Sequence, residues 1–330
     1  MSEIVLSSRV RLARNYEDLP FSARISPAQS EQCVQRTLDA LRDLEEIYTF
    51  FPLRGMEDAE KRALVESHLI SPDLLKNEEN AAVLIREDEK ISVMMNEEDH
   101  LRIQAFAPGT DLAAAAAGAF SIEDTLQRHL SFAFDPQLGY LTACPTNTGT
   151  GMRASMMLHL PMLTFFKQMG KVNQLAAKIG LTVRGIYGEG SEALGNLYQL
   201  SNQVTLGRTE KEIADAVAAL AGQIAEMEKA LREKAWEKDP LSFEDPLFRS
   251  WGLCLHARKM PLKEFMAHWS NLRLGADTGK LPLSAAQCDQ LLPLCQPAHV
   301  EKAAGASLEK KDVDAYRTEI IRRALNGGND

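Results

Sequence analysis

The chain has 330 residues, of which 45% are apolar and 25% charged, as is typical of a globular protein. At roughly 150 residues per domain, this length predicts about two domains. The net charge of −9 disfavours non-specific nucleic-acid binding, because such binding depends on basic residues that neutralise phosphates. No uncharged apolar run approaches the ~18 residues of a membrane span, and the five cysteines lack C-x-x-C spacing. We therefore expect a cytoplasmic protein with no membrane segment, disulfide framework or structural zinc.

Strands and helices are predicted in mixed order up to about residue 236. The sequence patterns predict strands over residues 4–14, 82–85, 91–95, 101–106, 138–143, 155–160, 181–185 and 197–204. They predict helices over residues 27–48, 56–70, 110–134 and 162–179. Thr209 and Glu212 form a capping-box pattern that opens a long helix to about residue 236. From Pro240 onward mostly short helices are predicted, so we expect two domains, residues 1–239 and 240–330.

Two glycine-rich stretches, residues 149–154 and 188–193, match the pattern Gly-x-Gly-x-x-Ala. A dinucleotide site would need a helix that opens at this pattern. The residues after Ala154 are strand-like instead, and Glu189 and Glu192 place negative charge where a pyrophosphate would bind. The sequence therefore disfavours a dinucleotide site, and it contains no Walker A loop.

Five arginines lie on predicted strands or beside the glycine-rich loops: Arg9, Arg11, Arg102, Arg153 and Arg184. Arg9 and Arg11 alternate on one strand, so their side chains share a face. A guanidinium presents a planar fork of donors that suits phosphate oxygens. If these strands meet in one sheet, the five side chains could surround a triphosphate. The alternative is that each is an ordinary surface arginine, which is the commoner case for any one of them.

A second group of candidate residues carries negative charge or a thiol. The carboxylates are those of Glu97, Glu98, Asp99, Glu189 and Glu192. They form either a solvated cluster or a site for a cationic substrate. Cys144 is either a small buried residue or a thiolate stabilised by nearby positive charge.

Several strings together resemble the phosphagen (guanidino) kinases. These are SSRVR at residues 7–11, NEEDHLR at 96–102 and CPTNTGT at 144–150. Two further strings resemble the bacterial protein arginine kinases within that family: RGIYGEGSEALGN at 184–196 and QPAH at 296–299. The resemblance extends from about residue 4 to 325. It implies an α+β fold, in which an antiparallel sheet flanked by helices is followed by an all-α C-terminal domain.

The resemblance also implies site roles and cofactors, namely ATP and Mg²⁺. The phosphate-binding positions are Arg9, Arg11, Arg102, Arg153 and Arg184, and a residue near the adenine is His68. Glu98 and Glu189 match the carboxylates that hold the guanidinium, and we favour Glu98 as the base, with Glu189 sharing or replacing that role. Cys144 matches a thiolate that contacts a guanidinium nitrogen, and Glu97 a residue that reaches the magnesium through water.

The resemblance favours a protein substrate over free arginine. Kinases of small guanidino compounds carry a helical domain before the first strand, whereas here that strand begins near residue 4. The chain also continues beyond residue 236 by an extent that matches a phosphoarginine-binding and dimerising domain. The family then implies substrates with exposed arginines, marking for Clp-type proteolysis in stress response, a zinc-containing activator protein and a homodimer. The alternatives are a kinase of free arginine or another small guanidino compound, and an inactive module that binds phosphoarginine or a partner.

The C-terminal part departs from the family at one motif. Protein arginine kinases carry Arg-Asp-x-x-Arg-Ala, which binds phosphoarginine allosterically. Here the matching residues retain Asp314 and Arg317, but Val313 replaces the first arginine and Thr318 the alanine. Because a phosphate needs a guanidinium partner, we predict that allosteric activation is weak or lost.

Overall fold

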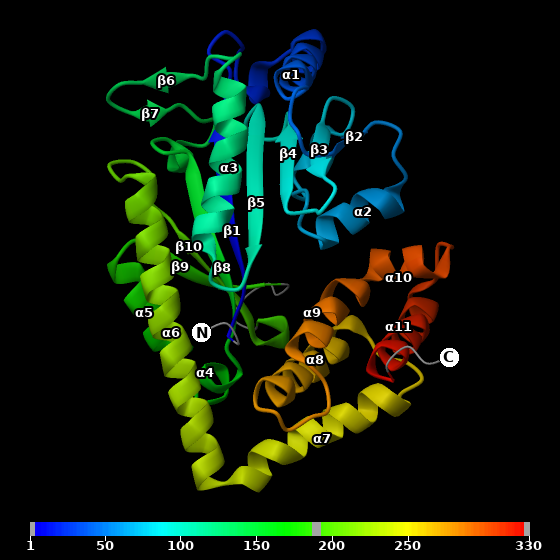
Figure 1. The fold of residues 1–330 in the computed structure, drawn as a ribbon. Helices are drawn as coiled ribbons and strands as arrows, with labels where there is room; N and C mark the ends of the chain where they lie inside the picture. The colour runs from blue at the N-terminus through cyan, green and yellow to red at the C-terminus, as the bar shows by residue number, and fades with distance from the viewer. Residues whose placement is uncertain (1–3, 187–192, 327–330) are drawn as a thin grey trace.

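A computed structural model describes residues 4–186 and 193–326 of the chain (Figure 1). Its centre is an antiparallel eight-stranded sheet in the order β2-β3-β4-β5-β1-β8-β10-β9. The strands are β1 (Val5–Arg14), β2 (Tyr48–Pro52), β3 (Ala82–Arg86), β4 (Ile91–Met95), β5 (Leu101–Pro108), β8 (Met152–His159), β9 (Leu181–Gly185) and β10 (Leu197–Asn202). A separate two-stranded ribbon contains β6 (Phe134–Asp135) and β7 (Gly139–Tyr140).

One face of the sheet carries the hydrophobic core. Strand alternation places Val10, Leu12 and Ile103 on this face, where they are fully buried. The face is covered by α3 (Leu112–Gln127) and α6 (Glu210–Lys238), which cross in front of the sheet in Figure 1. The capping box predicted at Thr209 opens α6 as expected. The opposite face carries a smaller hydrophobic core around Val83 and Met94 of β3 and β4, and polar residues on the neighbouring strands.

Several element boundaries differ from the sequence-based prediction. Helix α1 (Pro27–Ala40) ends earlier than residue 48, and Tyr48–Pro52 forms the edge strand β2 instead. Aromatic and β-branched side chains explain this strand, because they suit a sheet edge better than a helix. The helix predicted over 162–179 is two helices, α4 (Pro161–Phe165) and α5 (Met169–Lys178), separated at Lys167, whose φ is +55°.

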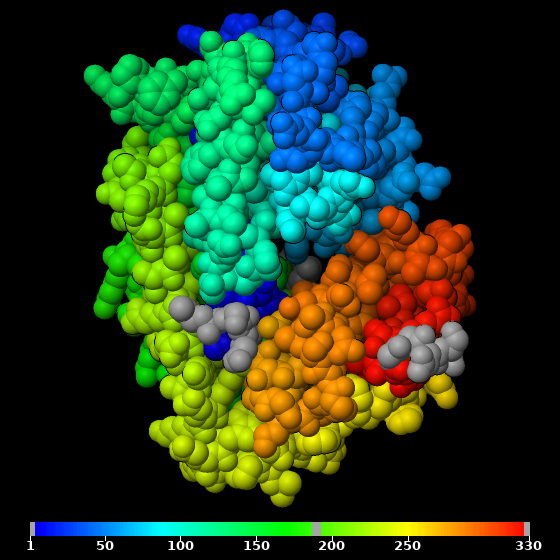
Figure 2. All heavy atoms as spheres, viewed as in Figure 1, coloured from blue at the N-terminus to red at the C-terminus, as the bar shows by residue number. Residues whose placement is uncertain are grey.

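The C-terminal helical region consists of α7 (Pro240–His256), α8 (Leu262–Asp277), α9 (Ala285–Leu294), α10 (Pro297–Ala304) and α11 (Lys310–Leu325). Its core surrounds Trp269 and Phe265, and it packs on Met162 and Leu197 of the sheet region. In Figures 1 and 2 this region, yellow to red, lies below the blue α2 (Asp58–Glu66). The predicted α+β fold followed by helices is confirmed. No helix among residues 4–186 and 193–326 is both long and apolar enough to cross a membrane.

Candidate active site

The strand register places all five candidate arginines on the sheet face opposite α3 and α6. Arg11 on β1 is the direct partner of Arg153 on β8. Arg102 on β5 lies opposite Ala13, two residues along β1 from Arg11 and therefore on the same face. On β9, Arg184 pairs with Gln199 of β10, and Gln199 pairs with Met157 on the face of Arg153. Five guanidiniums from four strands thus face the same side of the sheet.

The arginines on this face are buried close to one another, so the face is chemically suited to an anion. Burial, followed by the charges of Arg102 and Arg153, lowers the pKa of Arg9 to about 10. The pKa of Arg11 is lowered well below its ordinary value by burial and by the charge of Arg9. The Nε atoms of Arg11 and Arg153 are buried without a hydrogen-bond partner among the described residues. A bound polyanion would neutralise these charges and supply the acceptors that the buried donors require.

Glu97 and Glu98 are neighbours in sequence, but the side chain of Glu97 is buried and that of Glu98 is exposed. Glu97 is buried and binds Arg102 with both oxygens, at 2.7 Å from Nη1 and 2.6 Å from Nη2. Ser71 donates a further short hydrogen bond to the same carboxylate. The Glu97 carboxylate therefore fixes the direction of Arg102, while Nη2 of Arg102 lies 3.8 Å from the carboxylate of Glu98.

Glu98 faces solvent at a cavity of about 510 Å³, and its side chain is 44% exposed. Ser22, Pro27 and Ala143 contribute to the lining of this cavity. Burial, followed by the charge of Asp99, raises the pKa of Glu98 above its ordinary value. A carboxylate with a raised pKa at a solvent-accessible cavity is a suitable group to accept a proton from a cationic substrate.

Asp99 connects this acidic segment to the loop that carries Cys144. Its buried Oδ1 accepts hydrogen bonds from Asn15 Nδ2 and from the backbone N–H of Ala143, both at 2.7 Å. Asp99 lies within the NEEDH string, but the sequence alone indicates no individual role for it. Its bond to Ala143 fixes the residue directly before Cys144, and so connects the segment that carries Glu98 to the loop that carries Cys144.

Cys144 is half-buried and begins the short helix Pro145–Asn147. Its Sγ lies 3.0 Å from Thr146 Oγ1. Gly149, in the same loop, has a φ of +119°, and a Cβ there would lie 2.5 Å from the carbonyl oxygen of Thr205. The close approach of the Thr205 backbone explains why this position is a glycine. The strand β8 follows this loop instead of a helix, as expected from the sequence. Glu189 and Glu192 lie outside the described residues.

His68 lies beside Arg9, at the end of the arginine-lined face away from Arg102 and Glu98. It borders a cavity of about 230 Å³ together with Arg9, Phe106, Met157 and Gln199. Burial, followed by the charges of Arg9 and Arg11, lowers the pKa of His68 to about 4, so its ring is neutral near pH 7. A partly apolar cavity beside a row of arginines has the shape and chemistry for the base of a nucleotide.

Comparison with known proteins identifies the family. Residues 29–231 match the family described as ATP:guanido phosphotransferase, C-terminal catalytic domain. The chain belongs to the ATP:guanido phosphotransferase family. Residues 240–329 match a second family, described as protein-arginine kinase McsB C-terminal domain.

The similar relatives match the chain over nearly its whole length. A protein-arginine kinase from Caldanaerobacter subterraneus subsp. tengcongensis is 41% identical over 98% of this chain and 97% of its own. One from Bacillus subtilis is 41% identical over 98% of this chain and 91% of its own. Among solved structures, the duplicated taurocyamine kinase from Schistosoma mansoni with bound transition-state analogue components has a TM-score of 0.63 and 29% identity, covering 70% of this chain and 33% of that one. Lombricine kinase shares the fold, with a TM-score of 0.62 and 23% identity over 71% of this chain and 68% of that one.

The remaining candidate residues, Asp314 and Arg317, lie inside the C-terminal helical region of this ATP:guanido phosphotransferase. Arg317 is 1% exposed, and its Nη1 donates to Asp314 and to the carbonyl of Met260, both at 2.7 Å. Its Nε donates to the carbonyl of Cys295, also at 2.7 Å. These bonds connect α11 to the end of α9 and to the segment before α8, so Arg317 holds helices together in this arrangement.

Proposed function

We propose that this protein is an ATP-dependent protein-arginine kinase that transfers the γ-phosphoryl group of ATP to arginine side chains. The observation that carries the proposal is the row of five arginines on one sheet face, ending beside the carboxylate of Glu98. Membership of the ATP:guanido phosphotransferase family and full-length similarity to protein-arginine kinases support it.

The proposed reaction moves one phosphoryl group and one proton. Arg9, Arg11, Arg102, Arg153 and Arg184 bind the phosphates and stabilise the charge that develops on the transferred group. A guanidinium nitrogen attacks the γ-phosphorus, the new P–N bond forms, and the β,γ-bridging oxygen leaves with its electron pair as part of ADP. Glu98 accepts the proton that the nitrogen loses. Cys144 and Glu189 hold the guanidinium in line.

Magnesium is part of the proposal as an ion carried on the nucleotide phosphates. Mg²⁺ keeps several waters and uses substrate phosphates, so it needs at most one or two protein carboxylates. Glu97 fits a role through water better than direct ligation, because its Oε1 accepts hydrogen bonds from Arg102 and Ser71 and its Oε2 is in ion-pair contact with Arg102. When bound, the ion would neutralise phosphate charge together with the arginines.

We also propose two domains, residues 1–239 and 240–330, in a cytoplasmic homodimer. Asp239 ends α6 and caps α7, which supports a boundary there. The five cysteines are free, as a reducing compartment requires. Helix α7 exposes Leu241, Phe248 and Leu253, an apolar surface that a second copy could cover. The proposal includes a zinc-containing activator protein and a Clp-type unfoldase that receives the phosphorylated substrates.

Arg317 also bears on regulation by phosphoarginine. Its guanidinium already binds two carbonyls and Asp314, and the other arginine of the family motif is Val313 here. We therefore propose that allosteric activation is weak or lost. Strong activation by free phosphoarginine that disappears in Arg317→Ala would contradict this.

The test is direct detection of the product. The protein is incubated with ATP, Mg²⁺ and an unfolded substrate protein, and phosphoarginine is mapped by mass spectrometry under non-acidic conditions. We expect acid-labile phosphate on protein arginines, lost in Glu98→Gln and strongly reduced in Cys144→Ala. Turnover of free arginine with none on protein would support the small-molecule kinase instead. Nucleotide binding without any transfer would support the inactive binding module.

A further inference from the structure

The QPAH string at residues 296–299 lies where the C-terminal helical region meets α2. Pro297 is the first residue of α10, and Gln296 provides no side-chain cap for this helix. Glu66, the last residue of α2, supplies the cap instead. Its carboxylate accepts hydrogen bonds from the backbone N–H groups of Ala298, at 2.9 Å, and His299, at 3.1 Å. A carboxylate at a helix N-terminus is stabilised by the helix dipole as well as by these bonds.

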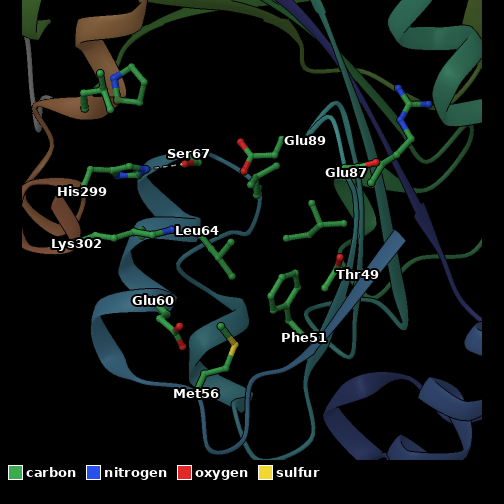
Figure 3. Close-up of a pocket in the computed structure, with 16 residues that line it drawn as sticks. Thr49, Phe51, Met56, Glu60, Leu64, Ser67, Glu87, Glu89, His299 and Lys302 are labelled. Carbon is green, nitrogen blue, oxygen red and sulfur yellow. Dashed lines mark hydrogen bonds between the residues drawn. The ribbon is translucent and has the colours of Figure 1, made fainter. Parts of the chain in front are cut away.

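The ring of His299 adds two bonds to the same end of α2. Its Nδ1 lies 2.9 Å from Glu66 Oε2. Its Nε2 lies 3.1 Å from Ser67 Oγ, and Figure 3 shows this contact. A carboxylate only accepts hydrogen bonds, so Nδ1 carries the proton. The C-terminal helical region therefore binds the side chains of the two residues that precede His68.

His68 occupies an unusual backbone position. Its φ is +59°, a conformation that normally favours glycine at the end of a helix. The N–H of His68 donates to the carbonyl of Val65 at 2.9 Å, and that of Leu69 donates to Leu64 at 3.0 Å, which completes a Schellman motif. A side chain held in a strained position at a binding cavity indicates that the side chain itself is needed there.

The turn of residues 66–69 is thus held from two sides. On the sheet side, Gln104 Nε2 donates to the carbonyls of His68, at 2.7 Å, and Leu69, at 2.9 Å. On the outer side, Glu66 and Ser67 are held by His299. Loss of either set would allow the turn to relax toward less strained backbone angles, and the His68 ring would move with it.

We propose that His299 is a positioning residue for nucleotide binding: through Glu66 and Ser67, the C-terminal helical region holds the turn that places His68 in the nucleotide cavity. This inference rests on the proposed placement of the nucleotide beside His68. It gives the C-terminal helical region a role in nucleotide binding by the sheet region.

His299→Ala is a suitable test because it leaves the helix contact in place. The two backbone bonds from α10 to Glu66 do not involve the ring. The ring also borders an open cavity of about 550 Å³ (Figure 3), so its removal creates no closed void in the core. We therefore expect the variant to fold with a melting temperature close to that of the parent chain.

The expected effect is on nucleotide affinity. His299→Ala should raise the Kd for Mg·ADP, measured by calorimetry on the full chain, about tenfold, which corresponds to ~1.4 kcal/mol. The KM for ATP should rise in parallel, with kcat within about twofold. His299→Asn should recover most of the affinity, because its amide N–H can still reach Glu66 as Nδ1 does.

A matched control lies one turn earlier on α2. Arg62 Nη2 binds Glu301 Oε2 at 2.7 Å, so Arg62→Gln breaks another contact between the same two helices without touching the turn at 66–69. It should leave the Kd unchanged. If Arg62→Gln raised the Kd for Mg·ADP as much as His299→Ala does, the inference would be overturned. The effect would then come from the contact between the two helices in general.

His68→Ala separates the two proposals. If His68→Ala leaves the Kd for Mg·ADP unchanged, the placement of the nucleotide is wrong and the inference falls with it. If His68→Ala weakens binding but His299→Ala does not, only the positioning role of His299 is wrong. If both weaken binding, the double variant should bind no more weakly than His68→Ala alone, because His299 acts through His68. Additive losses would contradict the inference.

Discussion

Asp99 provides the sharpest test of how the site is assembled. Its Oδ1 is the acceptor for Asn15 Nδ2 and for the N–H of Ala143, and the residue is 1% exposed. Hydrogen bonds to a charged acceptor contribute ~1.5–3 kcal/mol each. Asn15 Nδ2 also donates to the carbonyl of Leu141 at 3.1 Å. Loss of the Asp99 acceptor therefore costs Asn15 less hydrogen-bond energy than it costs the N–H of Ala143. We expect Asp99→Ala to lower the free energy of unfolding by about 3–4 kcal/mol.

The loss of activity in Asp99→Ala should exceed what the stability change explains. Release of the Ala143 N–H frees the backbone directly before Cys144, and a displacement of about 1 Å at a reacting group can cost ~100-fold in rate. The assay is kcat for protein-arginine phosphorylation at a temperature where urea titration shows the variant to be fully folded. A kcat within threefold of the parent value would refute the reasoning.

Asp99→Asn adds a second readout. The amide oxygen of asparagine can still accept both hydrogen bonds, so this variant should keep more activity than Asp99→Ala. Removal of the Asp99 charge should also lower the pKa of Glu98, because that charge helps to raise it. The acid limb of the kcat/KM profile should therefore move to lower pH. A limb that stays in place would show that Glu98 is not the group that titrates.

Three further predictions follow from single contacts. Since Glu98 must be ionised to accept a proton and its pKa is raised, kcat/KM should fall as the pH drops through that raised value, while circular dichroism shows an intact fold. Glu123→Ala should lower the free energy of unfolding by ~3–5 kcal/mol, because buried Arg14, which lies 2.5 Å from this carboxylate, loses its counter-ion. A decrease of less than about 1 kcal/mol in a urea titration would contradict this. Iodoacetamide should label one thiol per folded chain and five in denaturant, since only Cys144 is not fully buried, and Cys144→Ala should abolish labelling of the folded chain.

Local physics explains which parts of this protein could be predicted from sequence. Period-2 alternation placed Arg9 and Arg11 on one face of a strand, and the capping box at Thr209 opens a helix as expected. These features depend on residues close together in the chain. The family strings added the fold class, which the structure and the comparisons confirm. Helix ends were less predictable, as at Ala40, because a long-range strand pairing used Tyr48–Pro52 for the sheet edge.

Only the tertiary structure decided what each similar residue does. Glu97 and Glu98 are adjacent, yet Glu97 is buried against Arg102 and Ser71, whereas the side chain of Glu98 is 44% exposed and 3.8 Å from Arg102. Arg11 and Arg14 share a strand, yet their alternation along it places Arg11 on the arginine-lined face and Arg14 against Glu123. In each case the sequence determined the chemical group available, and its role followed from which distant segment lies against it.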